Sequence, residues 1–302
     1  MESTRRTFFR GCLAGALAPS PSRVVVARDT SLRLPSLLDQ SVMAFYNRDS
    51  AQEAWKLVAK PGEVIGLKVN CLSGHGGSTS VALVEAIAER LQQVGVPGKN
   101  IVIFDRLNSD LESAGFKPGS GRPRCIGNDS SGYEEDLEVH GSVGSRVSRA
   151  LTRTCDAVIN LPVLKDHGIV GVTMALKNLF GAIHNPNKYH PNNGNPYVAD
   201  VNMLAPIRNK VRLTICDATV AQYEGGPSYM PQWSWAFNGL LVARDPVALD
   251  TIGWQIIEAK RAEMGLPTLK AAGREPKYIA TAADAAHRLG VNDPARIEKV
   301  EV

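Results

Sequence analysis

The chain has 302 residues, of which 44% are hydrophobic, 21% charged and 6% aromatic, a composition that excludes collagen-like, disordered and disulfide-scaffold proteins. The formal net charge is +4, but residues 1–27 hold four arginines against one acidic residue, so the remainder is nearly neutral. We therefore expect no nucleic-acid partner and, since no apolar run approaches roughly 20 residues, no transmembrane segment in the mature protein.

The first residues predict an export signal. Arg5 and Arg6 stand side by side before two phenylalanines, and an apolar run of small residues follows over 11–18. The pair resembles a twin-arginine signal, and the apolar run has the length of a signal core rather than of a membrane span. A frayed basic helix is the structural alternative. The sequence thus predicts a periplasmic or otherwise exported protein whose first partner is the twin-arginine export machinery.

The cleavage position has two candidates. Ala18 ends a small-residue motif, but Pro19 would follow the cut, and Ala27 ends a second motif. We take residues 1–27 as the signal peptide and residues 28–302 as a single α/β domain.

Strands and helices alternate along this domain. Continuous apolar runs rich in β-branched residues are typical of strands buried on both faces. They cover residues 64–69, 101–104, 157–161, 211–216 and 239–243. Apolar residues at helical spacing predict helices over residues 36–45, 80–94, 142–153, 173–183, 198–210, 245–264 and 282–289. The alternation predicts a mainly parallel sheet with helices on both faces and Rossmann-like layering.

Two segments lack such patterns. Residues 117–133 are rich in Gly, Pro, Ser and Arg, and residues 184–197 hold three prolines and five asparagines. Both are expected to be loops, and the second cannot be a helix or a central strand.

The cysteines argue against a ferredoxin-type cluster. Cys71, Cys125, Cys155 and Cys216 follow the signal, and none belongs to a C-x-x-C motif. Cys216 lies within an apolar strand, so buried free thiols are the favoured interpretation. One disulfide, or a four-cysteine cluster assembled across the fold, stays open.

Polar residues gather beyond two predicted strands. Lys68 and Asn70 end the strand 64–69, and a glycine-rich loop then leads into a helix, where backbone N–H groups can approach an anion. Lys165 and His167 follow the strand 157–161. Because open α/β sheets bind ligands beyond the carboxyl ends of their strands, we expect these residues to share a pocket.

The next helix extends this group. It carries Lys177 and Asn178. Lys165 or Lys177 would hold a carboxylate or phosphate, and His167 would transfer a proton because its pKa lies near neutrality. Asp217, which ends a strand, or Asp250, near the apolar stripe of the helix 245–264, would supply the counter-charge. Each of these residues can also be an ordinary surface or core residue.

Three histidines leave a metal site open as an alternative. If the pocket bound a metal ion, His167, His184 and His190 would be the candidate ligands.

Several of these segments resemble the domain-of-unknown-function 362 (DUF362) family. The resemblance spans about residues 60–260. It rests on runs beginning Lys68-Val69-Asn70, Leu161-Pro162-Val163-Leu164-Lys165-Asp166-His167-Gly168, Thr173-Met174-Ala175-Leu176-Lys177-Asn178, Cys216-Asp217-Ala218, Gly225-Gly226-Pro227 and Asp245-Pro246-Val247-Ala248-Leu249-Asp250. It implies that iron–sulfur modules are sometimes fused to such domains and that some members carry twin-arginine signals; this chain has no such module.

The sequence thus predicts an exported α/β protein with a Lys/His-lined pocket for an anionic small molecule or cofactor, with no reaction assigned. A metal- or iron–sulfur-associated redox protein and a non-catalytic exported binding protein are the alternatives.

Overall fold

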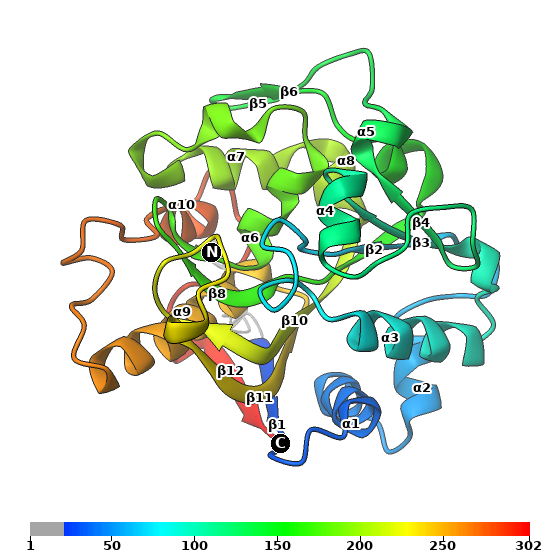
Figure 1. Cartoon of the computed structure of the whole chain (residues 1–302), viewed down its shortest axis with the longest axis horizontal. Coiled ribbons are helices and arrows are strands. Elements are labelled where there is room, and N and C mark those ends of the chain that lie inside the picture. The colour runs from blue at the N-terminus through cyan, green and yellow to red at the C-terminus, as the bar shows by residue number, and fades with distance from the viewer. Residues whose placement is uncertain (1–20) are drawn as a thin grey trace, which may run out of the picture.

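A mixed sheet of ten strands forms the centre of the computed structural model, which describes residues 21–302 (Figure 1). Arg5 and Arg6 of the expected signal lie outside the described residues. Eight strands follow one another across the sheet in the order β12-β1-β11-β10-β7-β2-β3-β4, while β8 pairs with the distal part of β10 and β9 pairs with β8. The strands are β1 (Ser22–Arg28), β2 (Ile65–Lys68), β3 (Ile101–Asp105), β4 (Arg124–Gly127), β7 (Ala157–Asn160), β8 (Val163–His167), β9 (Gly171–Thr173), β10 (Val211–Gln222), β11 (Ser234–Ala243) and β12 (Ile297–Glu301). A separate hairpin comprises β5 (Glu138–His140) and β6 (Val143–Ser145).

The parallel part of this sheet contains β2, β3, β4, β7 and β10. All four residues of β2 and of β7 are buried, which explains why the first three residues of each strand are apolar rather than alternating with polar ones. All five predicted strands are present, and the predicted α/β class is confirmed.

Helices cover both faces of the sheet. On one face lie α1 (Leu34–Tyr46), α2 (Ala51–Lys56) and α3 (Val81–Gln93). On the other lie α6 (Ala175–Asn178), α7 (Tyr197–Met203), α8 (Ala205–Lys210), α9 (Pro246–Glu263) and α10 (Tyr278–Ala283). Each face of the sheet thus has its own hydrophobic core. Alternate residues of β1 enter the two cores: Val25 and Ala27 pack on the α1–α3 side, and Val24 and Val26 on the opposite side. Helix α9 begins as predicted, with the Asp245 carboxylate accepting the N–H groups of Val247 and Ala248.

Strand β1 was not predicted. It pairs with β11 on one side and β12 on the other, and Val24, Val25, Val26 and Ala27 are buried. The boundary expected at residue 27 therefore falls inside β1.

Two predicted helices are wrong. Residues 142–153 form β6 and a π-helical turn (Ala150–Thr154), because Val143–Ser145 pairs with β5 in a hairpin. Residues 282–289 are mostly a turn after α10, which ends at Ala283. In both places tertiary contacts outweigh a local helical pattern.

Other expected elements are divided. The predicted helix 198–210 breaks at Leu204 into α7 and α8, because proline in the first turn of α8 cannot continue a preceding helix. The predicted helix 173–183 becomes the end of β9, α6 and a 3₁₀ turn (Leu179–Ala182). The expected loop 117–133 contains β4 and the short helix α5 (Asn128–Ser131), whereas residues 184–197 hold two 3₁₀ turns, Pro186–Tyr189 and Asn192–Gly194, and lead into α7.

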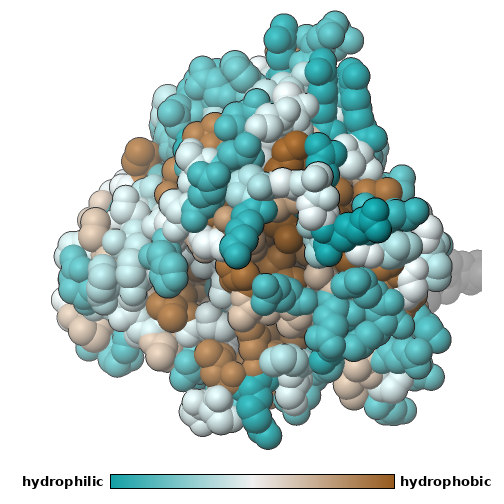
Figure 2. Space-filling model, turned by 45° about the vertical axis from the view of Figure 1, so that its right-hand side comes forward, coloured by the Kyte–Doolittle hydropathy of each residue, from teal (hydrophilic) through white to brown (hydrophobic). Residues whose placement is uncertain are grey.

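The four cysteines within residues 21–302 are free and buried, as the sequence favoured. None of the helices in that range combines the length and the hydropathy of a membrane span. In Figure 2 one face of the molecule is largely hydrophilic, with apolar surface exposed near its middle.

Candidate functional site

A cavity of about 380 Å³ lies beyond the carboxyl end of β2 and beside β8. Seven residues singled out from the sequence line it: Lys68, Asn70, Lys165, His167, Lys177, Asn178 and His190. They come from β2 and the loop after it, from β8, from α6 and, for His190, from the position after the 3₁₀ turn Pro186–Tyr189. One cavity therefore brings together side chains from β2, β8 and α6.

A buried ion pair forms one wall of the cavity. Lys68 ends β2 and Asp105 ends the neighbouring parallel strand β3, so both side chains meet at one sheet edge. Lys68 Nζ lies 2.7 Å from Asp105 Oδ1, and Asp105 Oδ2 accepts the N–H of Cys71 at 2.7 Å. A Cβ at Gly181 would lie 2.6 Å from Asp105 Oδ1, so only glycine lets this turn approach the pair.

A chain of amide side chains fixes the neighbouring wall. Asn70 Nδ2 donates to Asn178 Oδ1 at 3.0 Å, and Asn178 Nδ2 donates to Asn160 Oδ1 at 2.7 Å. Asn70 Oδ1 is buried and accepts no hydrogen bond within the described residues, and the same holds for Thr173 Oγ1. Because such polar atoms normally have a partner, both offer a bonding position to a bound molecule.

Lys165 and His167 lie in β8 itself rather than in a loop after a strand. Side chains alternate along a strand, so Lys165 and His167 share the cavity side while Asp166 turns away from it. Asp166 is buried and accepts hydrogen bonds from Gly226 N and Arg274 Nη1, both at 2.8 Å. This carboxylate thereby ties β8 to the loop after β10 and to the C-terminal segment.

The two remaining lysines have no carboxylate partner among the described residues. Lys165 Nζ donates to Ser73 Oγ and, at 2.9 Å, to Gly77 O. Burial lowers the pKa of Lys165 to about 8. Lys177 Nζ lies 4.0 Å from the centre of the Phe180 ring. Burial, followed by repulsion from Lys165 and Lys68, lowers the pKa of Lys177 to about 7.

His167 is a neutral hydrogen-bond donor toward the cavity. Its Nδ1 accepts the backbone N–H groups of Ile169 at 3.1 Å and Val170 at 3.3 Å, so the proton of the neutral ring is on Nε2. Burial, and then the charge of Lys177, lowers the pKa of His167 to about 2. His190 stacks on this ring, with the two centres 5.5 Å apart. The proton transfer expected of His167 has no support in this geometry.

Three predicted site residues lie outside the cavity lining. Asp217 accepts the N–H of Ser80 at 2.8 Å and so caps the start of α3. Asp250 accepts the N–H groups of Ala175 at 2.7 Å and Leu176 at 3.1 Å, while burial raises its pKa to about 8. Both carboxylates hold helix starts and neither provides the expected counter-charge.

His184, the third of these residues, is exposed and contacts Tyr133 edge to face. It is therefore separated from His167 and His190, which do line the cavity.

Sequence reasoning missed the counter-charge that is present. Asp105 directly follows the predicted strand 101–104, in the same position relative to its strand as Lys68. The rule that parallel strands end at one edge applied to it equally. Thr173, which begins one of the runs that resemble the family, and Phe180 also line the cavity, but neither was predicted as a site residue.

The cavity does not fit a metal or an iron–sulfur cluster. None of the cysteines of residues 21–302 lines it, and its two stacked histidines lie beside the Lys177 ammonium, which repels a cation. The surplus of positive charge suits an anion instead.

Residues 65–255 match the model of the family described as "Domain of unknown function (DUF362)". The chain is 28% identical over 240 residues to "Thylakoid-associated protein sll1697" of Synechocystis sp., covering 71% of this chain and 68% of that protein. A crystal structure of a Thermotoga maritima protein matches with a TM-score of 0.36 and 12% identity, covering 59% of this chain and 51% of that one.

Proposed function

This chain belongs to the DUF362 family, and we propose that its cavity binds a small organic molecule that carries a carboxylate or phosphate group. The volume of about 380 Å³ lies within the usual range for small-molecule sites.

The surplus positive charge of the cavity carries this proposal. Each carboxylate lining it already pairs with a cation, Asp105 with Lys68 and Asp110 with Arg106. Lys177 and Lys165 are buried without such a partner among the described residues. Placing a second unpaired cation beside the first is unfavourable, and a bound anion removes that penalty.

The other groups that line the cavity indicate what the rest of the bound small molecule should contain. Leu72, Ile169 and Phe180 offer apolar surface. Thr173 Oγ1 and Asn70 Oδ1 are polar atoms with a free bonding position. A compact molecule with an anionic head, an apolar body and a hydroxyl or amino group would satisfy all of them.

Catalysis is a second candidate function, favoured by the pKa of Lys177 at about 7. A lysine with such a pKa exists in both protonation states near neutrality and can move a proton to or from a bound anion. In this scheme Lys165 holds the anionic group and the His167 Nε2–H orients it, so the proton-transfer group is Lys177.

Paired probes test the binding proposal. We expect benzoate and phenyl phosphate to bind the wild-type chain in calorimetry at pH 7, and benzamide, which is uncharged, to bind more weakly. Lys177→Met should remove the preference for the anion. Lys277→Met, which alters an exposed lysine at the start of α10, is the matched control and should retain it. Equal binding of benzoate and benzamide by the wild-type chain would contradict the proposal.

Export is the second part of the proposal, and it rests on the adjacent arginines Arg5 and Arg6. We place the mature start near Ala18 rather than after Ala27. The reason is β1, which pairs with β11 through residues 25–28 and with β12 through residues 22–26, and which the later cut would remove almost entirely.

A further inference from the structure

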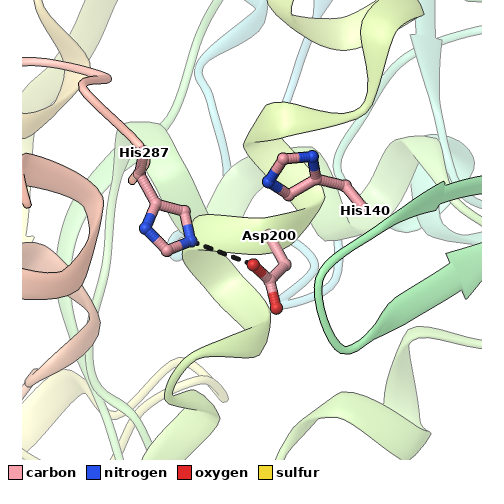
Figure 3. A group of neighbouring side chains, drawn as sticks. All are labelled: His140, Asp200 and His287. Carbon is pink, nitrogen blue, oxygen red and sulfur yellow. Dashed lines mark hydrogen bonds and ion pairs between the residues drawn. The ribbon is translucent and has the colours of Figure 1, made fainter. Parts of the chain in front are cut away.

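Three side chains from distant parts of the chain meet outside the cavity. His140 ends β5, Asp200 lies in α7, and His287 lies in the turn after α10. One ligand atom from each lies within 4.8 Å of the others. Figure 3 shows the two imidazole rings on either side of the Asp200 carboxylate. None of the three lines the cavity described above.

Neighbouring groups hold the ligand atoms in position. Asp284 Oδ1 lies 2.8 Å from His287 Nδ1, which directs the other ring nitrogen, Nε2, to within 2.9 Å of Asp200 Oδ1. The N–H of Ser142 donates to Asp200 Oδ2 at 2.8 Å, so Oδ1 is the oxygen that faces the histidines. A carboxylate behind a histidine, fixing its ring, is the usual outer partner of a metal-binding imidazole.

The hydrogen bonds around His287 are incomplete unless a cation or a proton lies between His287 and Asp200. Both nitrogens of His287 face carboxylate oxygens, so a neutral ring that donates from Nδ1 to Asp284 turns the lone pair of Nε2 toward Asp200. Two lone pairs at that distance repel unless a proton or a metal ion lies between them. His140 adds a third possible metal-ligand atom at the same point, and its side chain makes no hydrogen bond within the described residues.

The local backbone brings these groups together. Asp200 is 3% exposed, and a buried carboxylate needs a cation or donors. Gly141 has a φ of +51°, and a Cβ there would lie 2.5 Å from Asp200 Oδ1. The hairpin turn can therefore press onto α7 only with glycine, and this contact delivers His140 to the cluster.

We propose that His140, Asp200 and His287 bind a divalent first-row metal ion of the Zn²⁺ type. Two imidazoles and a carboxylate form a ligand set that suits this ion, and three protein ligands leave a position for water. Because Zn²⁺ holds such atoms at about 2.0–2.2 Å, small side-chain rotations suffice to close the cluster. The ion would tie the two-stranded β5–β6 hairpin and the C-terminal turn to α7. An isolated hairpin gains most from such a tie, because two strands alone are marginally stable.

Zinc titration of the full chain tests this site. After removal of metal with EDTA, we expect one Zn²⁺ per chain, measured by competition with a chromophoric chelator. Co²⁺ in its place should give the visible absorption of a bound ion. His140→Ala should lose this binding, and because the His140 side chain makes no hydrogen bond in the described residues, the variant should remain folded. Asp284→Asn should weaken binding by about 10- to 100-fold.

His184→Ala is the matched control, because His184 is also a histidine at the surface and lies outside the cluster. It should bind Zn²⁺ as the wild-type chain does. The proposal is overturned if the wild-type chain binds no stoichiometric Zn²⁺, if His140→Ala binds it equally well, or if His184→Ala loses it to the same extent.

Discussion

Replacing Lys177 with methionine should stabilise the ligand-free protein. Lys177 is buried, with its Nζ over the Phe180 ring and no carboxylate partner among residues 21–302. Methionine has a similar length, lacks the charge and keeps a favourable contact with an aromatic ring. The variant therefore removes an electrostatic penalty while it preserves packing, and a residue retained at such a penalty is expected to serve a ligand.

The pKa of Lys177 sets the size and the pH dependence of the effect. It falls from an ordinary 10.5 to about 7 on folding. Since a tenfold change in a protonation equilibrium is worth about 1.4 kcal/mol, this difference amounts to roughly 4 kcal/mol at pH 7, as an upper value. Above pH 10.5 the lysine is neutral in both states and the penalty vanishes. As pH falls toward 7 only the unfolded chain gains the proton, so the wild-type protein loses stability relative to the variant.

Urea unfolding of both proteins at pH 7 and pH 10 measures this difference. We expect Lys177→Met to raise the free energy of unfolding at pH 7 and to lose most of the advantage at pH 10. Lys277→Met, which alters an exposed lysine, should change stability little at either pH. A variant that is less stable than the wild type at pH 7, or a difference independent of pH, would refute the reasoning.

Three other predictions follow from the same structure. Asp105→Asn should lower the free energy of unfolding by about 3–5 kcal/mol because it leaves the buried Lys68 ammonium without its carboxylate, and the double variant with Lys68→Met should recover part of the loss; an unchanged urea midpoint would contradict this. The four cysteines of residues 21–302 should resist a thiol reagent in the native protein and react after unfolding, because burial raises the pKa of Cys125 to about 11 and of Cys155 to about 12, and raises that of Cys71 and Cys216 as well; rapid labelling of the native protein would count against it. N-terminal sequencing of the exported protein should find a start near Ala18, and a start at Arg28 would show that β1 is dispensable.

The sheet could be predicted from the sequence because strands that are buried on both faces consist mostly of consecutive apolar residues. The segments at β2, β3, β7, β10 and β11 each contain a mostly apolar, buried run. Strand β1 has the same apolar pattern, but it lies before Ala27, the second candidate for signal cleavage, and was therefore assigned to the expected signal peptide. Helices were harder to predict where pairing partners decide the conformation, as in β6, whose partner β5 cannot be identified from local spacing.

The candidate site was predictable to the level of topology. Lys68, Lys165, His167 and Lys177 were expected in one place because parallel strands end at one edge, and all four line the cavity. The orientation of individual acids was not predictable. Asp217 was expected at a strand end but lies within β10, where it accepts the N–H of Ser80 before α3, whereas Asp105 does end its strand and faces Lys68.

The role of His167 depends on a detail that no sequence pattern carries. The backbone N–H groups of Ile169 and Val170 occupy its Nδ1 and so fix the proton on Nε2, while burial keeps the ring neutral. His167, which was predicted to transfer protons because histidine usually has a pKa near neutrality, is instead a neutral hydrogen-bond donor. Lys177 is the group whose pKa lies near 7.

The pKa of the Lys177 ammonium, with and without an anion, tests the central proposal most directly. It can be followed by NMR on lysine labelled with ¹³C and ¹⁵N, with the resonance assigned by its absence in Lys177→Met. We predict a pKa near 7 in the free protein, a rise of about 1 unit or more with saturating benzoate, and no rise with benzamide. A pKa near 10.5 in the free protein, or a value that benzoate leaves unchanged, would contradict an anion-binding cavity built around Lys177.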